Sequence, residues 1–117
     1  MFVGTDIVSI DRIRESVEQY GSQFLNKIFT INEIEYSQGK KDGAIHLAGR
    51  FAAKESIKKA IFSSQILKQL DFIDIEIFND VNGAPKVSIL KELKFKKIEI
   101  SISHESKYAV AFALLVV

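Results

Sequence analysis

The first stretch of the chain alternates apolar with small or polar residues in the way that strands do. Between Phe2 and Ile10 the residues are mostly apolar or β-branched, and the alternation places Gly4, Asp6 and Val8 on one side. We therefore expect Asp6 inside a partly buried strand. Ser9 is expected to cap a helix that follows, because a serine oxygen at that position accepts from an early helical amide.

Helical patterns occupy most of the next fifty residues. Apolar residues recur at helical spacing from Ile13 to Tyr20, which predicts an N-terminal helix. The segment Thr30-Ile31-Asn32-Glu33 has the spacing of a capping box, and the short helix that it starts is expected to end near Gly39. The longest helical pattern runs from about Ala44 to Phe62.

This long helix is expected to carry a carboxylate on its apolar side. At about 100° per residue, one narrow stripe holds Ala44, Ala48, Phe51 and Phe62. Glu55 falls in the middle of the stripe, although burying an unpaired carboxylate costs several kcal/mol. Glu55 either pairs with Lys59 one turn later or lies at a rim of the domain, or it holds a hard metal ion.

The second half of the chain predicts antiparallel strands. Ile73, Ile75 and Ile77 alternate with acidic residues, which is typical of a strand with one solvated face. Asn82-Gly83 then supplies a turn, and a return strand is expected over Val87 to Ile89.

Two further strands are expected near the end of the sequence. Apolar and polar residues alternate from Ile98 to His104, and a turn leads to a last strand that begins at Tyr108. Alternate alanines from Ala109 to Ala113 share one face, so a helix or a neighbouring subunit can approach closely. The predicted fold is α+β, a single domain of residues 1–117 with a small, mainly antiparallel sheet packed against the long helix and the N-terminal helices.

Composition narrows the possible chemistry. The chain has no cysteine, which excludes disulfides, thiolate catalysis and zinc sites built on sulfur. His46 and His104 are too far apart in the sequence for a local metal pair, so a metal would rely mainly on oxygen ligands. A net charge of +1 argues against a nucleic-acid binder driven by bulk charge. The sequence shows neither an apolar run long enough for a bilayer nor a secretory signal, so we expect a cytoplasmic protein without membrane contact.

Asp6 and Glu55 together indicate a metal–phosphate site. Asp6 alone is more simply a strand-end aspartate that caps the next helix. The two carboxylates together are a sufficient protein contribution for Mg²⁺, which water and phosphate oxygens complete. Lys59 lies about 40° from Glu55 around the helix axis and can contact the same phosphate as a point charge.

For two other candidates the simplest interpretation is structural. Arg50 lies on a different side of the helix from Glu55. We therefore expect Arg50 on the solvated surface, unless a loop or a neighbouring subunit brings it to the same ligand. A histidine at a strand end, such as His104, is usually satisfied by a backbone carbonyl. Its position beside Ser101 and Ser103 leaves a ligand role open.

Three segments carry a resemblance to a known family. They are Gly4-Thr5-Asp6 with Arg12-Ile13, Gly49 to Ser56 with Lys59-Ala60, and Ser101 to His104. In order, in spacing and in chain length they resemble the holo-[acyl-carrier-protein] synthases, the short phosphopantetheinyl transferases of bacterial lipid synthesis. The resemblance covers nearly the whole chain. It implies transfer of phosphopantetheine from coenzyme A to a serine of acyl carrier protein, with release of adenosine 3′,5′-bisphosphate.

The resemblance also implies roles for single residues. Asp6 and Glu55 match the family's metal ligands, which hold Mg²⁺, and Lys59 matches the lysine that meets the diphosphate. A metal and a lysine offset the negative charge that gathers during phosphoryl transfer. Arg50 and His104 match positions that line the coenzyme A cleft, which in this family forms between the subunits of a homotrimer.

The resemblance assigns a docking surface as well, with two departures. Arg12 matches a docking position for the acidic carrier protein, and Lys27 extends the basic surface. Asp11 lies beside Arg12 and dilutes the positive charge of that face. The loop Asn82 to Lys86 lacks the lysine that many relatives place between the glycine and the proline, which puts its contacts with coenzyme A in doubt.

Two other functions remain open at this point. A metal-dependent hydrolase of nucleotides or of coenzyme A would use the same carboxylates and lysine, and would act without an acceptor protein. A non-catalytic module would tolerate Glu55→Ala, and would bind RNA or an acidic partner through Arg12, Arg14, Lys27, Lys40 and Lys41. The transfer reaction also needs a group that accepts the proton of the serine hydroxyl. A metal-bound water or a nearby carboxylate could accept it, and the sequence favours neither.

Overall fold

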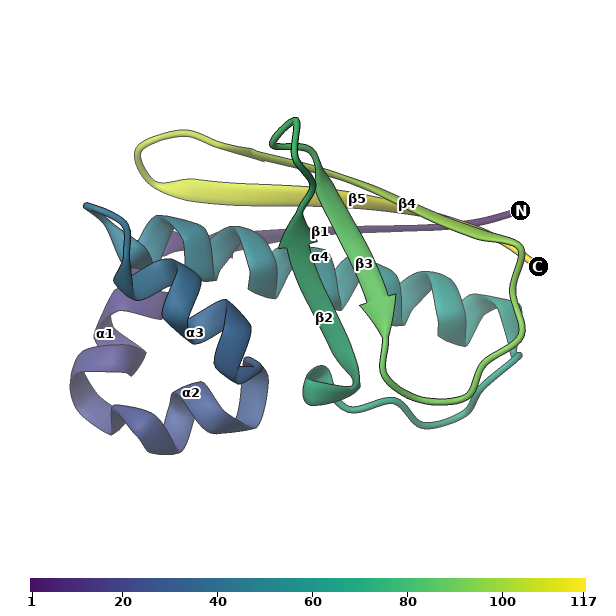
Figure 1. Cartoon of the computed structure of the whole chain (residues 1–117), viewed down its shortest axis with the longest axis horizontal. Coiled ribbons are helices and arrows are strands. Elements are labelled where there is room, and N and C mark those ends of the chain that lie inside the picture. Colours follow the sequence, from purple (N-terminus) through teal and green to yellow (C-terminus); the bar gives the residue numbers. More distant parts are fainter.

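The computed structural model describes all 117 residues, and its central element is one long helix, α4 (Gly43–Ser64). A three-stranded antiparallel sheet lies along one side of this helix (Figure 1). Its strand order is β1 (Phe2–Ser9), β5 (Tyr108–Val116) and β4 (Lys97–His104). No helix is both long enough and apolar enough to span a membrane.

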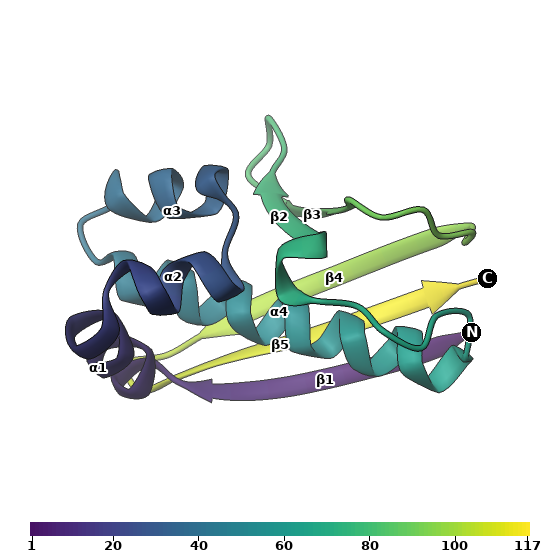
Figure 2. The same cartoon turned by 90° about the horizontal axis from the view of Figure 1, so that it is seen from below.

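The other elements cover the opposite side of α4, as Figure 2 shows. Three short helices gather around its N-terminal half: α1 (Ile10–Tyr20), α2 (Ser22–Ile28) and α3 (Ile31–Gln38). Ser9 caps α1, and Thr30 and Glu33 form a reciprocal capping box at the start of α3, so both predicted caps are confirmed. The predicted α+β fold is confirmed as well.

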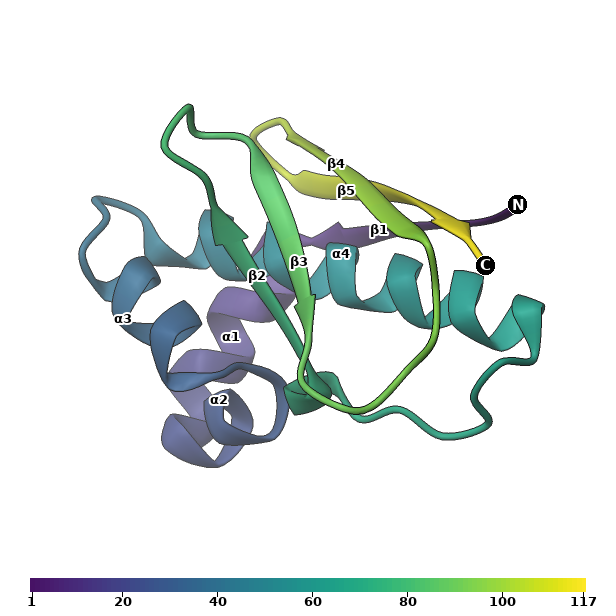
Figure 3. The same ribbon diagram turned by 45° about the vertical axis from the view of Figure 1, so that its right-hand side comes forward.

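A separate two-stranded sheet crosses α4 (Figure 3). It consists of β2 (Ile75–Asn79) and β3 (Pro85–Ile89), joined by a turn in which Gly83 has a φ of 85°, as the Asn-Gly pair predicts. The expectation that this strand includes Ile73 is wrong. Residues Phe72–Asp74 form a 3₁₀ turn, η1, because the side chains at either end of it cap each other's backbone.

The core lies on both sides of α4. Alanines 109, 111 and 113 of β5 are fully buried against the helix, so the predicted close approach of a helix to that face is confirmed. The predicted apolar stripe of α4 is wrong in part, because Phe62 is 39% exposed whereas Ile57 and Ile61 are buried. A helix covered by a sheet on one side and by other elements on the opposite side buries most of its circumference, so one narrow stripe does not describe it.

Strand β1 touches α4 at Gly4. A Cβ atom at this position would lie 1.9 Å from the carbonyl oxygen of Ser56, so only glycine permits the two backbones to approach so closely. Asp6 follows Gly4 by two residues on β1, and Glu55 precedes Ser56 on α4. The contact therefore brings the two carboxylates together.

Candidate functional site

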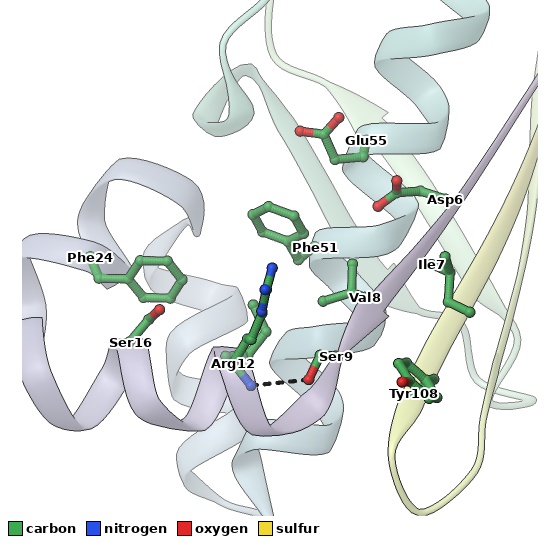
Figure 4. A pocket seen from close by; sticks show the side chains of 11 residues that line it. Asp6, Ile7, Val8, Ser9, Arg12, Ser16, Phe24, Phe51, Glu55 and Tyr108 are labelled. Atoms are coloured by element: carbon green, nitrogen blue, oxygen red, sulfur yellow. Dashed lines mark hydrogen bonds between the residues drawn. The ribbon is translucent and has the colours of Figure 1, made fainter.

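A cavity of about 630 Å³ opens between β1, α1, α2 and α4. Asp6 from β1 and Glu55 from α4 line it together, and Arg12 extends from α1 into the same space (Figure 4). The aromatic rings of Phe24 and Phe51 form an apolar part of the wall. The predicted pair of carboxylates thus shares one cavity, at a distance of 49 residues along the chain.

Lys59 pairs with Asp6 rather than with Glu55. Its Nζ atom donates to Oδ1 of Asp6 at 3.2 Å and to the backbone oxygen of Thr5 at 2.9 Å. Glu55 forms no ion pair, so the simpler interpretation of Glu55 as a partner of Lys59 is wrong. Because α4 runs along β1, the lysine reaches the strand instead. The Lys59 side chain is 53% exposed and the Asp6 side chain 18%, so this cluster is open to solvent.

The two carboxylates suit a hard metal ion that keeps most of its ligands outside the protein. No group of three or more His, Asp or Glu side chains lies close enough to hold a metal ion on its own. An ion between Asp6 and Glu55 would depend on water and on substrate oxygens for its other ligands. Mg²⁺ binds proteins in this way, through one or two carboxylates and the phosphates of a substrate.

Arg50 and His104 belong to a second cavity, of about 220 Å³. None of the residues that line it lines the first cavity. Within one chain, therefore, the fold does not bring Arg50 and His104 to Asp6 and Glu55.

Arg50 is buried, so the expectation of a solvated surface arginine is wrong. Only 5% of the residue is exposed, because α3 and the β2–β3 hairpin cover this side of α4. Its Nη2 atom donates to Oδ1 of Asn79 at 2.8 Å, and its Cζ atom lies 4.1 Å from the centre of the Tyr36 ring. The buried Nε atom has no hydrogen-bond partner. Burial lowers the pKa of Arg50, and Tyr36 opposes that shift.

His46, which sequence reasoning did not assign to any site, lines the same second cavity. Its ring packs edge-on against Tyr36 at 5.5 Å between centroids. The two histidines, far apart in the sequence, share a cavity because β4 packs beside α4. The available signal was the spacing of His46 and Arg50, since residues four apart are neighbours on a helix.

Sequence reasoning also missed a buried ion pair. Lys54 and Glu33 are both inaccessible to solvent, and Lys54 Nζ lies 2.6 Å from Glu33 Oε1. The same ammonium group donates to the backbone oxygens of Ile28 at 2.7 Å and Phe72 at 3.1 Å. Burial lowers the pKa of Lys54, and the charge of Glu33 opposes that shift.

Glu33 uses both carboxylate oxygens. One accepts from the backbone N–H of Thr30 and the other from that of Ile77, each at 2.8 Å. The pair therefore joins α3 and β2 to α4. A heptad spacing of Leu47, Lys54 and Ile61 places the lysine on a buried face of the helix and was the signal that could have revealed it.

The predicted docking residues lie along a continuous surface. Arg12 lines the first cavity, and Lys27 lines a neighbouring cavity of about 230 Å³ together with Tyr20. Phe24 borders both cavities, so it connects the two basic residues.

Arg14 is occupied elsewhere. It forms a two-point ion pair with Asp42, with N–O distances of 2.9 and 3.2 Å. Hydrogen bonding to Arg14 lowers the pKa of Asp42. Arg14 is therefore not a free cation on the docking surface.

Residues 2–113 match the 4′-phosphopantetheinyl transferase superfamily. Similar proteins include the holo-[acyl-carrier-protein] synthase of Protochlamydia amoebophila, which is 46% identical over 116 residues, or 96% of this chain and 94% of the relative. The protein of the same name from Thermodesulfovibrio yellowstonii is 46% identical over 113 residues, or 97% of this chain and 96% of the relative.

Solved structures agree with the sequence comparison. The holo-(acyl-carrier-protein) synthase of Bacillus anthracis in complex with CoA (3′,5′-ADP) has a TM-score of 0.83 and 35% identity, over 98% of this chain and 95% of that chain. The enzyme of Helicobacter pylori in complex with coenzyme A has a TM-score of 0.83 and 32% identity, over 97% of this chain and 98% of that chain.

Proposed function

Because this chain belongs to the 4′-phosphopantetheinyl transferase superfamily, we propose that it transfers phosphopantetheine from coenzyme A to a serine of apo acyl carrier protein. The products are holo acyl carrier protein and adenosine 3′,5′-bisphosphate, and the reaction serves lipid synthesis in the cytoplasm. The observation that carries the proposal is the presence of Asp6 and Glu55 on the wall of one cavity. A diphosphate is the group that such a pair, with a lysine beside it, is equipped to receive.

In this proposal Asp6 and Glu55 hold Mg²⁺ and the first cavity holds the diphosphate. When bound, the ion offsets the negative charge of the diphosphate. Lys59 adds a positive charge beside Asp6, on a flexible side chain that is half exposed and can therefore turn from Asp6 toward a phosphate. Phe24 and Phe51 limit the access of water, which would otherwise compete with the serine hydroxyl.

The carrier protein docks across the surface from Arg12 to Lys27. Both residues are exposed and neither forms an ion pair within the chain, so they are available to acidic side chains. Phe24 between them offers an apolar contact beside the mouth of the cavity. A carrier bound here would present its serine to the cavity that Asp6 and Glu55 line.

We propose further that the working unit is a homotrimer. The face of the three-stranded sheet away from α4 is apolar and exposed, with Val3, Ile7, Val110 and Phe112 between 39% and 65% accessible. Protein surfaces rarely leave such a patch uncovered. Ile7 belongs both to this face and to the first cavity, so a neighbouring subunit on the face would border the cavity. Its own Arg50 and His104 would then complete the coenzyme A site.

The test of transfer is direct. The protein is incubated with coenzyme A, Mg²⁺ and an apo acyl carrier protein, and the carrier is analysed by intact-mass spectrometry. We expect the carrier to gain one phosphopantetheine group. No gain at any practical enzyme concentration would refute the transferase assignment, and release of adenosine 3′,5′-bisphosphate without an acceptor would favour a hydrolase.

The test of a shared site uses mixed assemblies. Glu55→Gln and His104→Ala impair opposite halves of the proposed site, so random mixing of the two variants leaves about a quarter of the sites intact. We expect co-expressed chains to recover about a quarter of the wild-type rate. A rate equal to the mean of the two pure variants would mean that each site lies within one chain.

A further inference from the structure

The second cavity has the composition of an anion site. Its lining includes Arg50 and both histidines of the chain, His46 and His104, and no aspartate or glutamate. Neutral partners, among them Tyr36 and Asn79, complete the polar part of the wall. A cavity with one permanent cation, two groups that become cations on protonation and no carboxylate attracts a negatively charged ligand.

Arg50 is built into this cavity rather than free to move. Its hydrogen bond to Asn79 and its contact with the Tyr36 ring hold the guanidinium from two sides. The Nε atom is buried without a partner. An unpaired buried donor is costly and is uncommon in folded proteins, so this atom marks the surroundings of Arg50 as incompletely satisfied within the chain.

His46 lies one helical turn before Arg50, within the same set of charges. Tyr36 of α3 contacts its ring, Lys40 and Asp42 approach from the loop before α4, and Arg50 and His104 face it from α4 and β4. Desolvation lowers the pKa of His46, and the charges of Arg50, Lys40 and His104 lower it further, whereas Asp42 raises it. In the free protein, therefore, the imidazole is predominantly neutral near pH 7.

An anion bound in the cavity would favour the protonated form of His46 over the neutral form. A phosphate group bound in this cavity would carry up to two negative charges beside His46, would favour the protonated imidazole and would so raise the pKa of His46. The complex then takes up a proton that the free protein lacks. By linkage, a ligand whose complex binds more protons than the free protein binds more tightly as the pH falls through the interval between the two pKa values.

We infer that His46 acts with Arg50 and His104 to hold a phosphate group of coenzyme A, and that protonation of His46 strengthens this binding. The nature of the ligand rests on the proposed function, whereas the anion site rests on the cavity itself. His46 is a binding residue in this proposal and takes no part in the transfer step.

The experiment measures binding without any transfer. Dissociation constants of adenosine 3′,5′-bisphosphate are determined by calorimetry between about pH 6 and pH 8 at constant ionic strength, for the wild type and for His46→Gln. The phosphate groups of the ligand also lose negative charge at low pH, which changes the affinity of both proteins. The quantity compared at each pH is therefore the ratio of the dissociation constants of the wild type and His46→Gln. We expect the wild type to gain about three- to tenfold in affinity over the variant as the pH falls.

Two controls isolate the role of His46. Lys68→Gln removes an exposed cation beyond the end of α4, outside this cavity, and should keep the pH dependence of the wild type. His46→Asn, compared by thermal unfolding and circular dichroism, provides a second folded variant without a titratable group. Both His46 variants should show the same flattened profile.

Further ligands identify the phosphate. If the gain occurs with coenzyme A and not with dephospho-coenzyme A, the group is the 3′-phosphate. If it occurs with both, His46 contacts the diphosphate, and the diphosphate is then not held by the first cavity alone. A constant ratio of wild type to His46→Gln at every pH would overturn the inference. If the protein transfers phosphopantetheine but the binding ratio is constant, only this inference is refuted. If the ratio changes with pH but no phosphopantetheine is transferred, only the proposed function is refuted.

Discussion

Helix α4 carries two neighbouring charged residues, Lys54 and Glu55, whose surroundings differ in almost every respect. Lys54 is fully buried, and its three N–H groups donate to Glu33 and to two backbone oxygens. Glu55 lies at a cavity that Asp6 also lines, and it forms no ion pair (Figure 4). One charge is satisfied entirely from within the chain, and the other has capacity left for a ligand.

Whether a charged side chain has all its hydrogen bonds filled distinguishes a structural residue from a functional one better than its burial or its charge does. A buried ion with every hydrogen bond filled has nothing left to offer a substrate, and removing its partner leaves an uncompensated charge. A carboxylate at a cavity keeps lone pairs for a metal or a donor. We therefore expect substitutions at Lys54 to change stability and substitutions at Glu55 to change activity.

Lys54→Met should produce the largest effect, and the effect should be on folding. The substitution leaves Glu33 buried without its cation and removes the donor from the carbonyl groups of Ile28 and Phe72. Breaking one side of a buried pair costs about 3–5 kcal/mol, a large part of the stability of a typical domain. Urea unfolding followed by circular dichroism measures the loss.

The control is the same substitution one turn further along. Lys58 is half-buried above the ring of Phe72 and forms no ion pair, so Lys58→Met should cost much less. In a double-mutant cycle, Lys54→Met should cost less in a Glu33→Gln background than in the wild type. A Lys54→Met protein of wild-type stability that fails to transfer would reverse the assignment of the two clusters.

Glu55→Gln should produce the second-largest effect, and this effect should be on the rate of transfer. It removes one negative charge from the proposed metal site without changing the shape of the side chain. Loss of one electrostatic group at a reacting centre typically costs about 10²–10³-fold in rate, and we expect a loss of that size in holo acyl carrier protein formation. The concentration of Mg²⁺ needed for half-maximal rate should rise, because one ligand is lost.

Stability provides the counter-check for Glu55→Gln. Its urea midpoint should stay close to that of the wild type, as should that of Glu35→Gln, which alters an exposed glutamate of α3. Glu35→Gln should also keep full activity. Retention of the wild-type rate by Glu55→Gln would remove this residue from the proposed site.

Gly4→Ala should affect both properties, to a smaller extent. The new methyl group would lie 1.9 Å from the carbonyl oxygen of Ser56, so β1 and α4 must move apart. Overpacking of this kind costs about 1–3 kcal/mol, and a shift of Asp6 away from Glu55 should slow transfer about tenfold or more. Gly39→Ala is the matched control, because a Cβ there meets its neighbours at 3.6 and 3.7 Å. Equal effects of the two substitutions would contradict this account.

Much of the fold could be predicted from local signals. The caps at Ser9 and Thr30, the Asn-Gly turn before β3 and the alanine face of β5 each depend on a few neighbouring residues. The shared cavity of Asp6 and Glu55 was also expected, because both positions faced inward in their patterns and matched one family.

What could not be predicted depends on packing between distant elements. Arg50 was expected in solvent, and only the covering of α4 on a second side by α3 and the β2–β3 hairpin buries it. The same covering hides Lys54, whose partner Glu33 is 21 residues away. His46 and His104 meet only through the packing of β4 beside α4. Periodicity within one helix carries no information on these contacts.

Arg14→Ala should have the smallest effect, although Arg14 has two short hydrogen bonds to Asp42. Both side chains are about two-fifths exposed, at 41% and 38%, so water and salt screen the pair. We expect the melting temperature to fall by about 5 °C or less, and the KM for the carrier protein to stay at the wild-type value. Arg12→Ala, two residues earlier, should raise that KM several-fold, because Arg12 is unpaired and lines the cavity. An equal rise for the two variants would show that the Arg14–Asp42 pair opens when the carrier docks. Pairing would then not be sufficient to withhold a surface cation from a partner, and the distinction between satisfied and available charge would hold only for the buried pair.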